Sequence, residues 1–506
     1  MDAQLASEAP AKRSVIDWVK QNPIAPVLVL LAFAVRLWAS DGLGGLSNAL
    51  GYDGNVYFQA GLSLAAGELP YRDFVLVHPP GIAVVLAPFS LVAQLTDDAK
   101  AFAAARLTFM VLGAVGALLI YLVAKRVGTV AAVVAGLAYC VQPGLIYTQR
   151  IPYLELFMVL ATLVGLLLLN RKAPARLWLI LGGALFGLAV ATKIWAAIPL
   201  LVIAIGFLIF KSWRTASIYF GSAVAVGTAI MLPFFIAAPS QMLGLTVTDQ
   251  LGRPPVPGRG LARLELIYGL TPNLERSFSW PIVIGLFLVT VAVMLVVWFK
   301  RPVARIWVVL CAVQLLVIMY TPTFFQAYKA FYAVGLILLY AAFAQIVFDP
   351  LAQRWRAGSR LGPIVGIGAL SAAVALSSLF ILQRRTPDAG TPVPVSALTA
   401  AVSDGKCVTS DSPSLEILSN SLSRNLANGC SVLVDIRGTK FSTTLAGYHE
   451  IIANYLDSGD YVIIGRRKGG IDAANFQRVI EGRPVVMRDG KRFTVYGPRT
   501  DVATTG

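Results

Sequence analysis

Residues 51–81, GYDGNVYFQAGLSLAAGELPYRDFVLVHPPG, place Asp53, Arg72, Asp73 and His78 in one short loop. The loop lies between a long apolar run and a shorter one. What these four ionisable side chains do depends on the apolar segments around them, and on the side of a membrane that the loop faces.

The composition is that of a membrane protein. Of the 506 residues, 57% are hydrophobic and only 13% are charged, and the mean hydropathy is +0.72. A soluble domain carries roughly 25% charged residues. Many apolar runs of about 17–22 residues match the length that crosses a ~30 Å hydrocarbon core. The sequence therefore predicts several membrane-spanning helices.

The formal net charge of +16 follows the membrane topology. Basic residues cluster in every second gap between apolar runs, as Lys and Arg do in cytoplasmic loops. The clusters include Lys125 with Arg126, Arg171 with Lys172, and Lys300 with Arg301. This distribution argues against a nucleic-acid partner.

We place an N-terminal segment at residues 1–23 in the cytoplasm and let successive apolar runs cross the membrane in opposite directions. This gives about eleven spans in a membrane domain at 24–390. The spans are expected at 24–40, 103–124, 129–147, 153–169, 177–192, 194–210, 216–237, 281–299, 304–321, 328–348 and 362–382. An odd number places the C-terminal tail outside, on the same side as a first external loop at 41–102. Within that loop, Val56–Ala66 is expected to form an amphipathic helix ended by Gly67, and Gly81–Leu95 a re-entrant or interfacial segment.

The composition changes at about residue 395. KCVTSD, SVLVDI, DYVIIG and RFTVYG are expected to be strands, and Ser414–Leu422, Tyr448–Leu456 and Asn475–Ile480 helices. This order predicts a small extracytoplasmic α/β domain at 395–506 with a largely parallel sheet. Cys407 and Cys430 begin the first two expected strands, so they lie within disulfide reach in an oxidising compartment. The fold class is mainly α, a polytopic transmembrane helical bundle followed by this domain.

The gaps expected outside are unusually polar, and ionisable groups at membrane depth are usually retained for function. Arg and Lys are the side chains that bind phosphate oxygens. A carboxylate beside them can take a proton from an attacking hydroxyl. A lipid-linked phosphate would arrive at this depth, so the pattern predicts transfer of a group from a lipid phosphate to an alcohol. The outward candidates are Asp53, Arg72, Asp73, His78, Arg150, Glu155, Lys193, Arg253 and Arg263.

The first loop resembles that of C-type (GT-C) membrane glycosyltransferases. The resemblance lies in an acidic residue, a short helix, Gly-x-x-Pro-Tyr-x-Asp at 67–73 and the turn HPPG at 78–81. QRIPYLE at 149–155 and GLAVATK at 187–193 also resemble segments of that superfamily, and the similarity covers roughly 24–350. Its members use polyprenyl-phosphate sugars and include protein mannosyltransferases, lipid A aminoarabinose transferases and actinobacterial mannosyl- and arabinosyltransferases.

The resemblance implies roles for individual residues. Asp53 matches the catalytic base of the loop. Substrate binding falls to Asp73, His78, Arg72, Glu155 and Arg150, and binding of the lipid phosphate to Lys193, Arg253 and Arg263. The sequence has no Asp-x-Asp pair of the kind found in nucleotide-sugar enzymes. This absence favours a lipid-linked donor and gives no support to a required metal, and we expect no other cofactor. In the relatives the anomeric carbon usually inverts, so the resemblance implies inversion here.

Each residue also has a structural alternative. Asp53 can be the N-cap of the following helix, Arg72 and Asp73 an ion pair, and His78 the anchor of a turn. Glu155 can stabilise a helix dipole, and Lys193 can extend to the membrane interface. Arg253 and Arg263 can lie on a solvated face of their loop.

We expect a multi-pass enzyme that moves mannose or arabinose to a glycan, glycolipid or protein acceptor at the external face, among membrane lipids. The alternative is a transporter or flippase of a lipid-linked sugar. Transporters usually carry internal repeats and mid-membrane polar groups, and neither is visible here. The C-terminal domain is expected to hold a large acceptor, or else to act as a stabilising cap.

Overall fold

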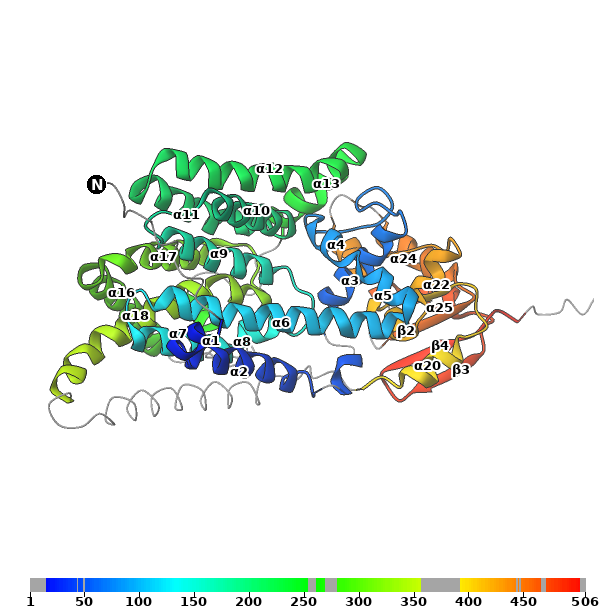
Figure 1. The fold of residues 1–506 in the computed structure, drawn as a ribbon. Coiled ribbons are helices and arrows are strands. Elements are labelled where there is room, and N and C mark those ends of the chain that lie inside the picture. The colour runs from blue at the N-terminus through cyan, green and yellow to red at the C-terminus, as the bar shows by residue number, and fades with distance from the viewer. Residues whose placement is uncertain are drawn as a thin grey trace, which may run out of the picture.

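Helices make up most of the chain, and they form a bundle with a smaller C-terminal part at one end (Figure 1). The computed structural model describes residues 15–42, 44–48, 51–253, 261–268, 280–355, 392–442, 445, 447–465 and 470–500. The described residues from 392 onward are called the C-terminal part below. Figure 1 shows this part beside α3 (Tyr52–Ala65), α4 (Gly81–Leu86) and α5 (Phe89–Leu95) of the first loop, although they are far apart in the sequence.

The bundle contains a helix at ten of the expected spans, and the span expected at 362–382 lies outside the described residues. The helices are α2 (Ile24–Trp38), α6 (Asp98–Ala124), α7 (Thr129–Val141), α8 (Pro143–Gln149), α9 (Glu155–Leu169), α10 (Arg176–Thr192), α11 (Ala197–Phe210), α12 (Trp213–Ala237), α16 (Trp280–Lys300), α17 (Arg305–Tyr320) and α18 (Lys329–Trp355). Among the described residues, five helices are long and apolar enough to cross a membrane, or six if the bent pair α7–α8 is one span; five more apolar helices are shorter. The chain is thus a multi-pass membrane protein.

Short elements connect the helices of the bundle. They are α1 (Val15–Gln21), η1 (Gly44–Ser47), η2 (Ile194–Ala196), α13 (Pro239–Leu243), η3 (Gly244–Thr248), α14 (Asp249–Leu251), α15 (Leu261–Tyr268), η4 (Pro302–Ala304) and η5 (Gln326–Tyr328). Several of them, including η2 and η5, lie at the end of the bundle that meets the first loop. The expected N-terminal segment at 1–23 falls mostly outside the described residues.

A proline bends the third expected span. α7 and α8 meet at 57°, because Pro143 lacks an N–H group and cannot continue the helix. The side chain of Gln142 caps the new helix by accepting the Leu145 N–H at 2.7 Å. The bend carries the chain into residues 150–154, which pass beside the first loop.

The first loop is buried more deeply than its sequence predicts. α3 (Tyr52–Ala65) begins four residues before the expected start at Val56, and its residues 54–63 are all buried. An amphipathic helix with one polar face was expected, and that prediction is wrong, because α21 (Pro413–Leu418) and α22 (Leu422–Ala427) of the C-terminal part pack on α3. The expected re-entrant segment is two short helices, α4 (Gly81–Leu86) and α5 (Phe89–Leu95).

The C-terminal part contains a four-stranded sheet and several helices. The strands are β1 (Val408–Ser410), β2 (Tyr461–Gly465), β3 (Val485–Asp489) and β4 (Phe493–Tyr496), in the order β1-β2-β4-β3. The helices are α20 (Val395–Ala401), α21 (Pro413–Leu418), α22 (Leu422–Ala427), α23 (Ile436–Phe441), α24 (Tyr448–Asp457) and α25 (Ala473–Ile480). Only β1 and β2 pair in parallel, and the other two pairs are antiparallel.

Two strand predictions for this part are therefore corrected. SVLVDI is not a strand, because residues 431–435 run as an irregular segment into α23. The largely parallel sheet is also wrong, since β3 and β4 return as an antiparallel pair next to β2. The disulfide between Cys407 and Cys430 is present, with Cα atoms 5.7 Å apart, and Cys140 and Cys311 are buried free cysteines.

Candidate active site

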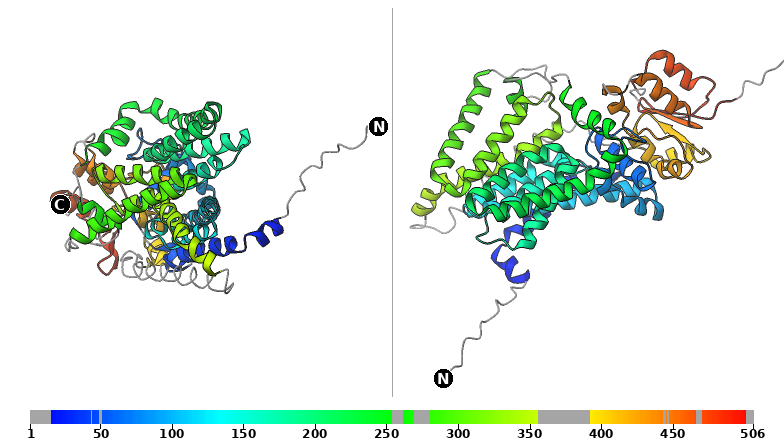
Figure 2. Two further views of the ribbon diagram at one scale, coloured as in Figure 1. Left: turned by 90° about the vertical axis from the view of Figure 1, so that its left-hand side faces the viewer. Right: turned by 90° about the horizontal axis from the view of Figure 1, so that it is seen from above.

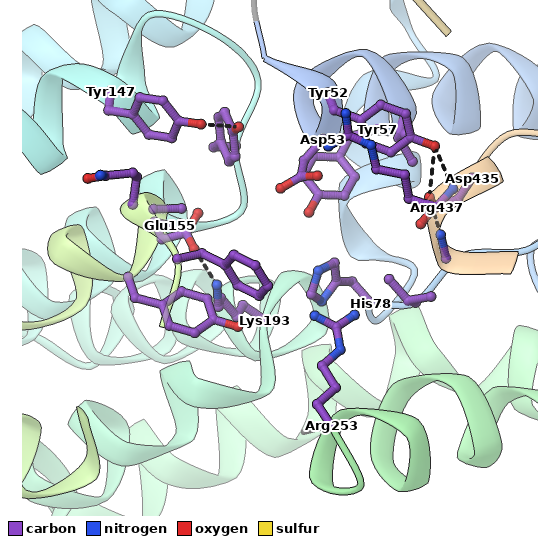
Figure 3. A pocket seen from close by; sticks show the side chains of 18 residues that line it. Tyr52, Asp53, Tyr57, His78, Tyr147, Glu155, Lys193, Arg253, Asp435 and Arg437 are labelled. Carbon is purple, nitrogen blue, oxygen red and sulfur yellow. Dashed lines mark hydrogen bonds and ion pairs between the residues drawn. The ribbon is translucent and has the colours of Figure 1, made fainter. Parts of the chain in front are cut away.

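A cavity of about 310 Å³ lies where the first loop, the bundle and the C-terminal part meet (Figure 3). Its wall combines carboxylates, cations and several tyrosines, a lining suited to a polar and charged ligand. Its lining residues are Tyr52, Asp53, Val56, Tyr57, Val77, His78, Tyr147, Tyr153, Glu155, Lys193, Arg253, Phe325, Gln326, Ala327, Tyr328, Asp435, Arg437 and Gly438. The sequence candidates Asp53, His78, Glu155, Lys193 and Arg253 are thus brought together.

Asp53 lies in the first turn of α3, with its side chain in the cavity (Figure 3). It is not the N-cap that was considered as an alternative: the N-cap is Gly51, with φ 57°. Within the described residues, no hydrogen bond or ion pair engages the Asp53 carboxylate. The start of α3 is held by close packing, since a Cβ on Gly54 would lie 2.5 Å from Ile151 Cγ1.

The protein around the cavity raises the pKa of Asp53 to about 6. The carboxylate is open to the cavity but surrounded by protein, and loss of bulk water is the largest cause. The negative charges of Asp435 and Glu155 raise the pKa further, while Arg437 and Lys193 oppose them. A carboxylate with this pKa can hold and release a proton near neutral pH.

Lys193 and Glu155 form a buried ion pair. Lys193 ends α10 and Glu155 begins α9, so two adjacent helix ends meet there. The Lys193 ammonium also lies 4.5 Å from the ring centroid of Tyr328 and 5.3 Å from that of Trp195. Much of its charge is therefore balanced by protein groups.

His78 stands on the cavity wall with its ring edge-on to Tyr57, the centroids 5.8 Å apart. The pKa of His78 is lowered well below its usual value, first by loss of water and then by the positive charges of Lys193 and Arg253. His78 is therefore neutral at physiological pH. Its backbone carbonyl accepts a hydrogen bond from the Tyr71 hydroxyl at 2.6 Å, which fixes the Pro-Pro turn.

Arg253 enters the cavity from the segment after α14 (Figure 3). Its guanidinium carbon lies 5.8 Å from the ring centroid of Phe325. In the described part of the chain, no carboxylate forms an ion pair with it. Arg259 and Arg276, which belong to the same loop in the sequence, lie outside the described residues.

Arg72 and Asp73 do not line this cavity. They form an exposed ion pair at 2.7 Å, and Asp73 also accepts the Leu69 N–H at 2.7 Å. The ion pair lowers the pKa of Asp73. Both residues border a separate hollow between the first loop and the C-terminal part, together with Gln241 and Asn454. The ion pair named as the structural alternative for Arg72 and Asp73 is therefore present.

Arg150 and Arg263 are buried structural residues away from the cavity. Arg150 donates to the Ala39 carbonyl at 2.6 Å, which ties the end of α8 to the end of α2. Arg263 donates to the carbonyls of Ile318 and Thr321 at 3.1 and 3.2 Å, at the C-terminal end of α17. Neither guanidinium is placed to bind a ligand in the cavity.

Three residues of the cavity wall were not expected from the sequence: Tyr52, Asp435 and Arg437. The Tyr52 hydroxyl donates to Asp435 Oδ1 at 3.2 Å and accepts the Arg437 backbone N–H at 2.9 Å. Asp435 lies within the segment SVLVDI, which was expected to be a strand, and Arg437 directly follows it, so no sequence signal connects them to the first loop. Among the described residues, no group of three His, Cys, Asp or Glu side chains lies close enough to hold a metal ion.

Comparisons with known proteins agree on the class. A family model described as dolichyl-phosphate-mannose-protein mannosyltransferase matches residues 77–237. ArnT from Cupriavidus metallidurans in the apo state has 15% sequence identity and a TM-score of 0.55, over 94% of this chain and 98% of that chain. Its structure bound to undecaprenyl phosphate has the same identity and TM-score, over 96% and 98%. No curated protein sequence matches the chain.

A second group of solved structures has the same fold. The archaeal oligosaccharyltransferase AglB from Archaeoglobus fulgidus, in complex with an inhibitory peptide and a dolichol-phosphate, has 13% identity and a TM-score of 0.55, over 89% of this chain and 70% of that chain. The chain is thus a membrane protein with the fold of the C-type glycosyltransferases. The resemblance to this class that the first loop predicted is confirmed.

Proposed function

We propose that the protein is a membrane glycosyltransferase that moves a sugar from a polyprenyl-phosphate donor to a hydroxyl group of a cell-envelope acceptor. The observation that carries the proposal is Asp53: a carboxylate with a pKa of about 6 in a cavity that also presents cations. The fold is shared with ArnT, which has been solved with undecaprenyl phosphate bound, and with AglB, solved with a dolichol-phosphate.

In the proposed reaction, the acceptor oxygen attacks the anomeric carbon of the donor. The bond between that carbon and the phosphate oxygen breaks, and its electron pair leaves with the lipid phosphate. Asp53 takes the proton of the attacking hydroxyl, which is the task of a general base. One base and a direct displacement give inversion at the anomeric carbon, and the step requires no metal ion.

The side chains around Asp53 have distinct parts in this proposal. The neutral imidazole of His78 can donate a hydrogen bond to a sugar hydroxyl or accept one from it. The cations neutralise the phosphate as it leaves. The basic clusters at alternate gaps favour the external face of the membrane for this cavity, so the C-terminal part is extracytoplasmic, where its disulfide persists.

Replacing Asp53 with Asn tests the mechanism, because Asn has nearly the same shape and cannot accept the proton. Transfer should fall by about 10²–10⁴-fold, the range for loss of a general base. Asp73→Asn is the matched control, since Asp73 lies outside the cavity, and it should retain activity. The assay measures release of free polyprenyl phosphate and formation of the glycosidic bond in purified protein. A fully active, folded Asp53→Asn protein contradicts the proposal, and movement of the sugar lipid without bond formation indicates a transporter.

A further inference from the structure

The C-terminal part reaches the cavity through Tyr52, the residue that precedes Asp53. Asp435 caps α23 by accepting the Gly438 N–H at 2.8 Å, and the Tyr52 hydroxyl bridges Asp435 and the Arg437 backbone. A residue in the first turn of α3 and a helix N-terminus about 380 residues later in the chain therefore share one hydrogen-bonded junction.

Arg437 is held at this junction with its guanidinium against an aromatic ring. The guanidinium carbon lies 4.1 Å from the ring centroid of Tyr52, a stacked arrangement that keeps the positive charge. Figure 3 shows the two residues side by side at the cavity, next to Asp53. The charge of Arg437 lowers the pKa of both Asp53 and Asp435, so its field reaches the carboxylates of the site.

Direct contacts with the rest of the chain fix the position of Arg437. A Cβ on Gly438 would lie 2.7 Å from Val77 Cγ1, so α23 packs directly against the turn that carries His78. Gln59 of α3 donates to Glu416 at 3.0 Å, and Ser442 donates to Asp249 at 2.6 Å. The C-terminal part is thereby anchored on both sides of the cavity.

The other two cations proposed from the sequence to bind the lipid phosphate, Lys193 and Arg263, already interact with groups of the protein. Lys193 is matched by the buried carboxylate of Glu155, and Arg263 donates to backbone carbonyls. Among the described residues that line the cavity, two carry a guanidinium group, Arg253 and Arg437. A planar guanidinium matches the oxygens of a phosphate better than an ammonium does.

We propose that Arg437 and Arg253 together bind the phosphate of the lipid-linked donor, so that the C-terminal part supplies half of the phosphate site. This inference rests on the proposed function. The donor phosphodiester carries one negative charge, and the phosphate gains a second as the bond to the sugar breaks. Two guanidinium groups bound to the phosphate stabilise the transition state more than the bound donor. The C-terminal part is then a component of the active site, beyond the acceptor-holding or capping roles expected for it.

Binding of undecaprenyl phosphate to the purified full-length protein in detergent tests this inference, with undecaprenol as the uncharged probe. Arg437→Ala should weaken undecaprenyl phosphate binding by about 10- to 100-fold, the range for loss of a charged hydrogen bond. Arg437→Lys keeps the charge without the fork and should give a smaller loss. Arg488→Ala, an exposed arginine at β3, is the matched control and should bind as the wild type does. Undecaprenol binding should be the same in all four proteins.

Each other outcome overturns a distinct claim. Equal affinity of the wild type and Arg437→Ala for undecaprenyl phosphate overturns the role of Arg437 and leaves the proposed function standing. An equal loss for undecaprenol shows a structural effect, and also overturns that role. A wild-type protein that does not distinguish the phosphate from the alcohol overturns the proposed lipid-phosphate donor itself. If Arg437→Ala does not fold, Arg437→Lys decides by the same comparison.

Discussion

At the scale of single residues, the protonation of Asp53 depends on the charged groups that surround it in the cavity. Asp53 is unpaired among the described residues and lies within the fields of two further carboxylates, Glu155 and Asp435. Two cations, Lys193 and Arg437, limit the resulting rise in its pKa. The balance leaves Asp53 ionised at neutral pH and still basic enough to accept a proton, which is the compromise that a general base needs.

The pH dependence of kcat/KM is the first prediction at this scale. In the proposed mechanism Asp53 is the base, so activity requires its ionised form. Activity should therefore rise with pH to a plateau above about 6, the pKa of Asp53 in the free protein. The neutral His78 should add no second step near pH 6.5, because its pKa is far below that value. Removal of the Arg437 charge should move the midpoint of the pH profile to higher pH, because that charge favours the ionised form of Asp53. A flat profile from pH 5 to 8 contradicts the assignment of Asp53.

The Lys193–Glu155 pair gives the second prediction. Lys193→Met leaves the Glu155 carboxylate buried without its partner, which should cost about 3–5 kcal/mol of the free energy of unfolding. The double variant with Glu155→Gln removes both charges and should recover most of that loss. Thermal unfolding in detergent measures both proteins. If the single variant is as stable as the wild type, the pair is not the buried ion pair described.

At the scale of elements, the cavity is built from helix ends. Asp53 begins α3, Glu155 begins α9, Lys193 ends α10 and Asp435 precedes α23. Each of these positions lies where the chain leaves a packed helix, so the side chains are held by the rigid helices behind them. Sites of this kind are lost when one helix end moves by a small distance.

Gly81 at the start of α4 tests this dependence. A Cβ there would lie 2.6 Å from the Ala191 carbonyl oxygen, two residues before Lys193. Gly81→Ala should therefore push α4 from the end of α10, cost about 1–3 kcal/mol of stability and lower transfer activity. Gly221→Ala in α12 is the control, because nothing lies within 4 Å of the added methyl group.

The control should be neutral or stabilising by up to about 1 kcal/mol, since Ala is favoured over Gly inside a helix. Stability is measured by thermal unfolding of the two purified variants, and activity by the transfer assay. Equal behaviour of the Gly81 and Gly221 variants contradicts the close approach of α4 to α10.

At the scale of the whole molecule, the C-terminal part and the bundle close one cavity between them. Figure 2 shows the C-terminal strands and helices at one end of the long bundle, with the blue first loop between them. Asp98 of α6 accepts the Ser423 N–H at 3.0 Å, and Asn420 accepts the Ala99 N–H at 3.0 Å. The C-terminal part is therefore hydrogen-bonded to the start of α6 as well as to the first loop.

The disulfide between Cys407 and Cys430 offers a way to measure how far transfer activity depends on a folded C-terminal part. It closes a loop with a sequence separation of 23, and its removal should cost about 3 kcal/mol in the chain-entropy account. Replacing both cysteines with Ser should lower the unfolding temperature of the C-terminal part. Transfer should be lost in the same temperature range, because Asp435 and Arg437 leave the cavity when that part unfolds. Activity that persists after the C-terminal part has unfolded contradicts this coupling.

The sequence alone determined the class of this protein and singled out Asp53, the residue proposed here as the base. Apolar runs of bilayer length, basic clusters in alternate gaps and the acid of the first loop are local patterns, and local patterns can be read from one chain. They predicted the helices of the bundle and the resemblance to C-type glycosyltransferases. Of the nine candidate site residues, five line one cavity: Asp53, His78, Glu155, Lys193 and Arg253.

Only the tertiary structure decided which cations face the cavity and what closes it. Arg150 and Arg263 are the same residue type as Arg253, but carbonyl groups contributed by distant segments bind their guanidinium groups. Asp435 and Arg437 are far from Asp53 in the sequence, and they reach it because the C-terminal part packs on α3 and hydrogen-bonds to Tyr52. Such contacts depend on packing between distant segments, and no periodicity or spacing within either segment records them.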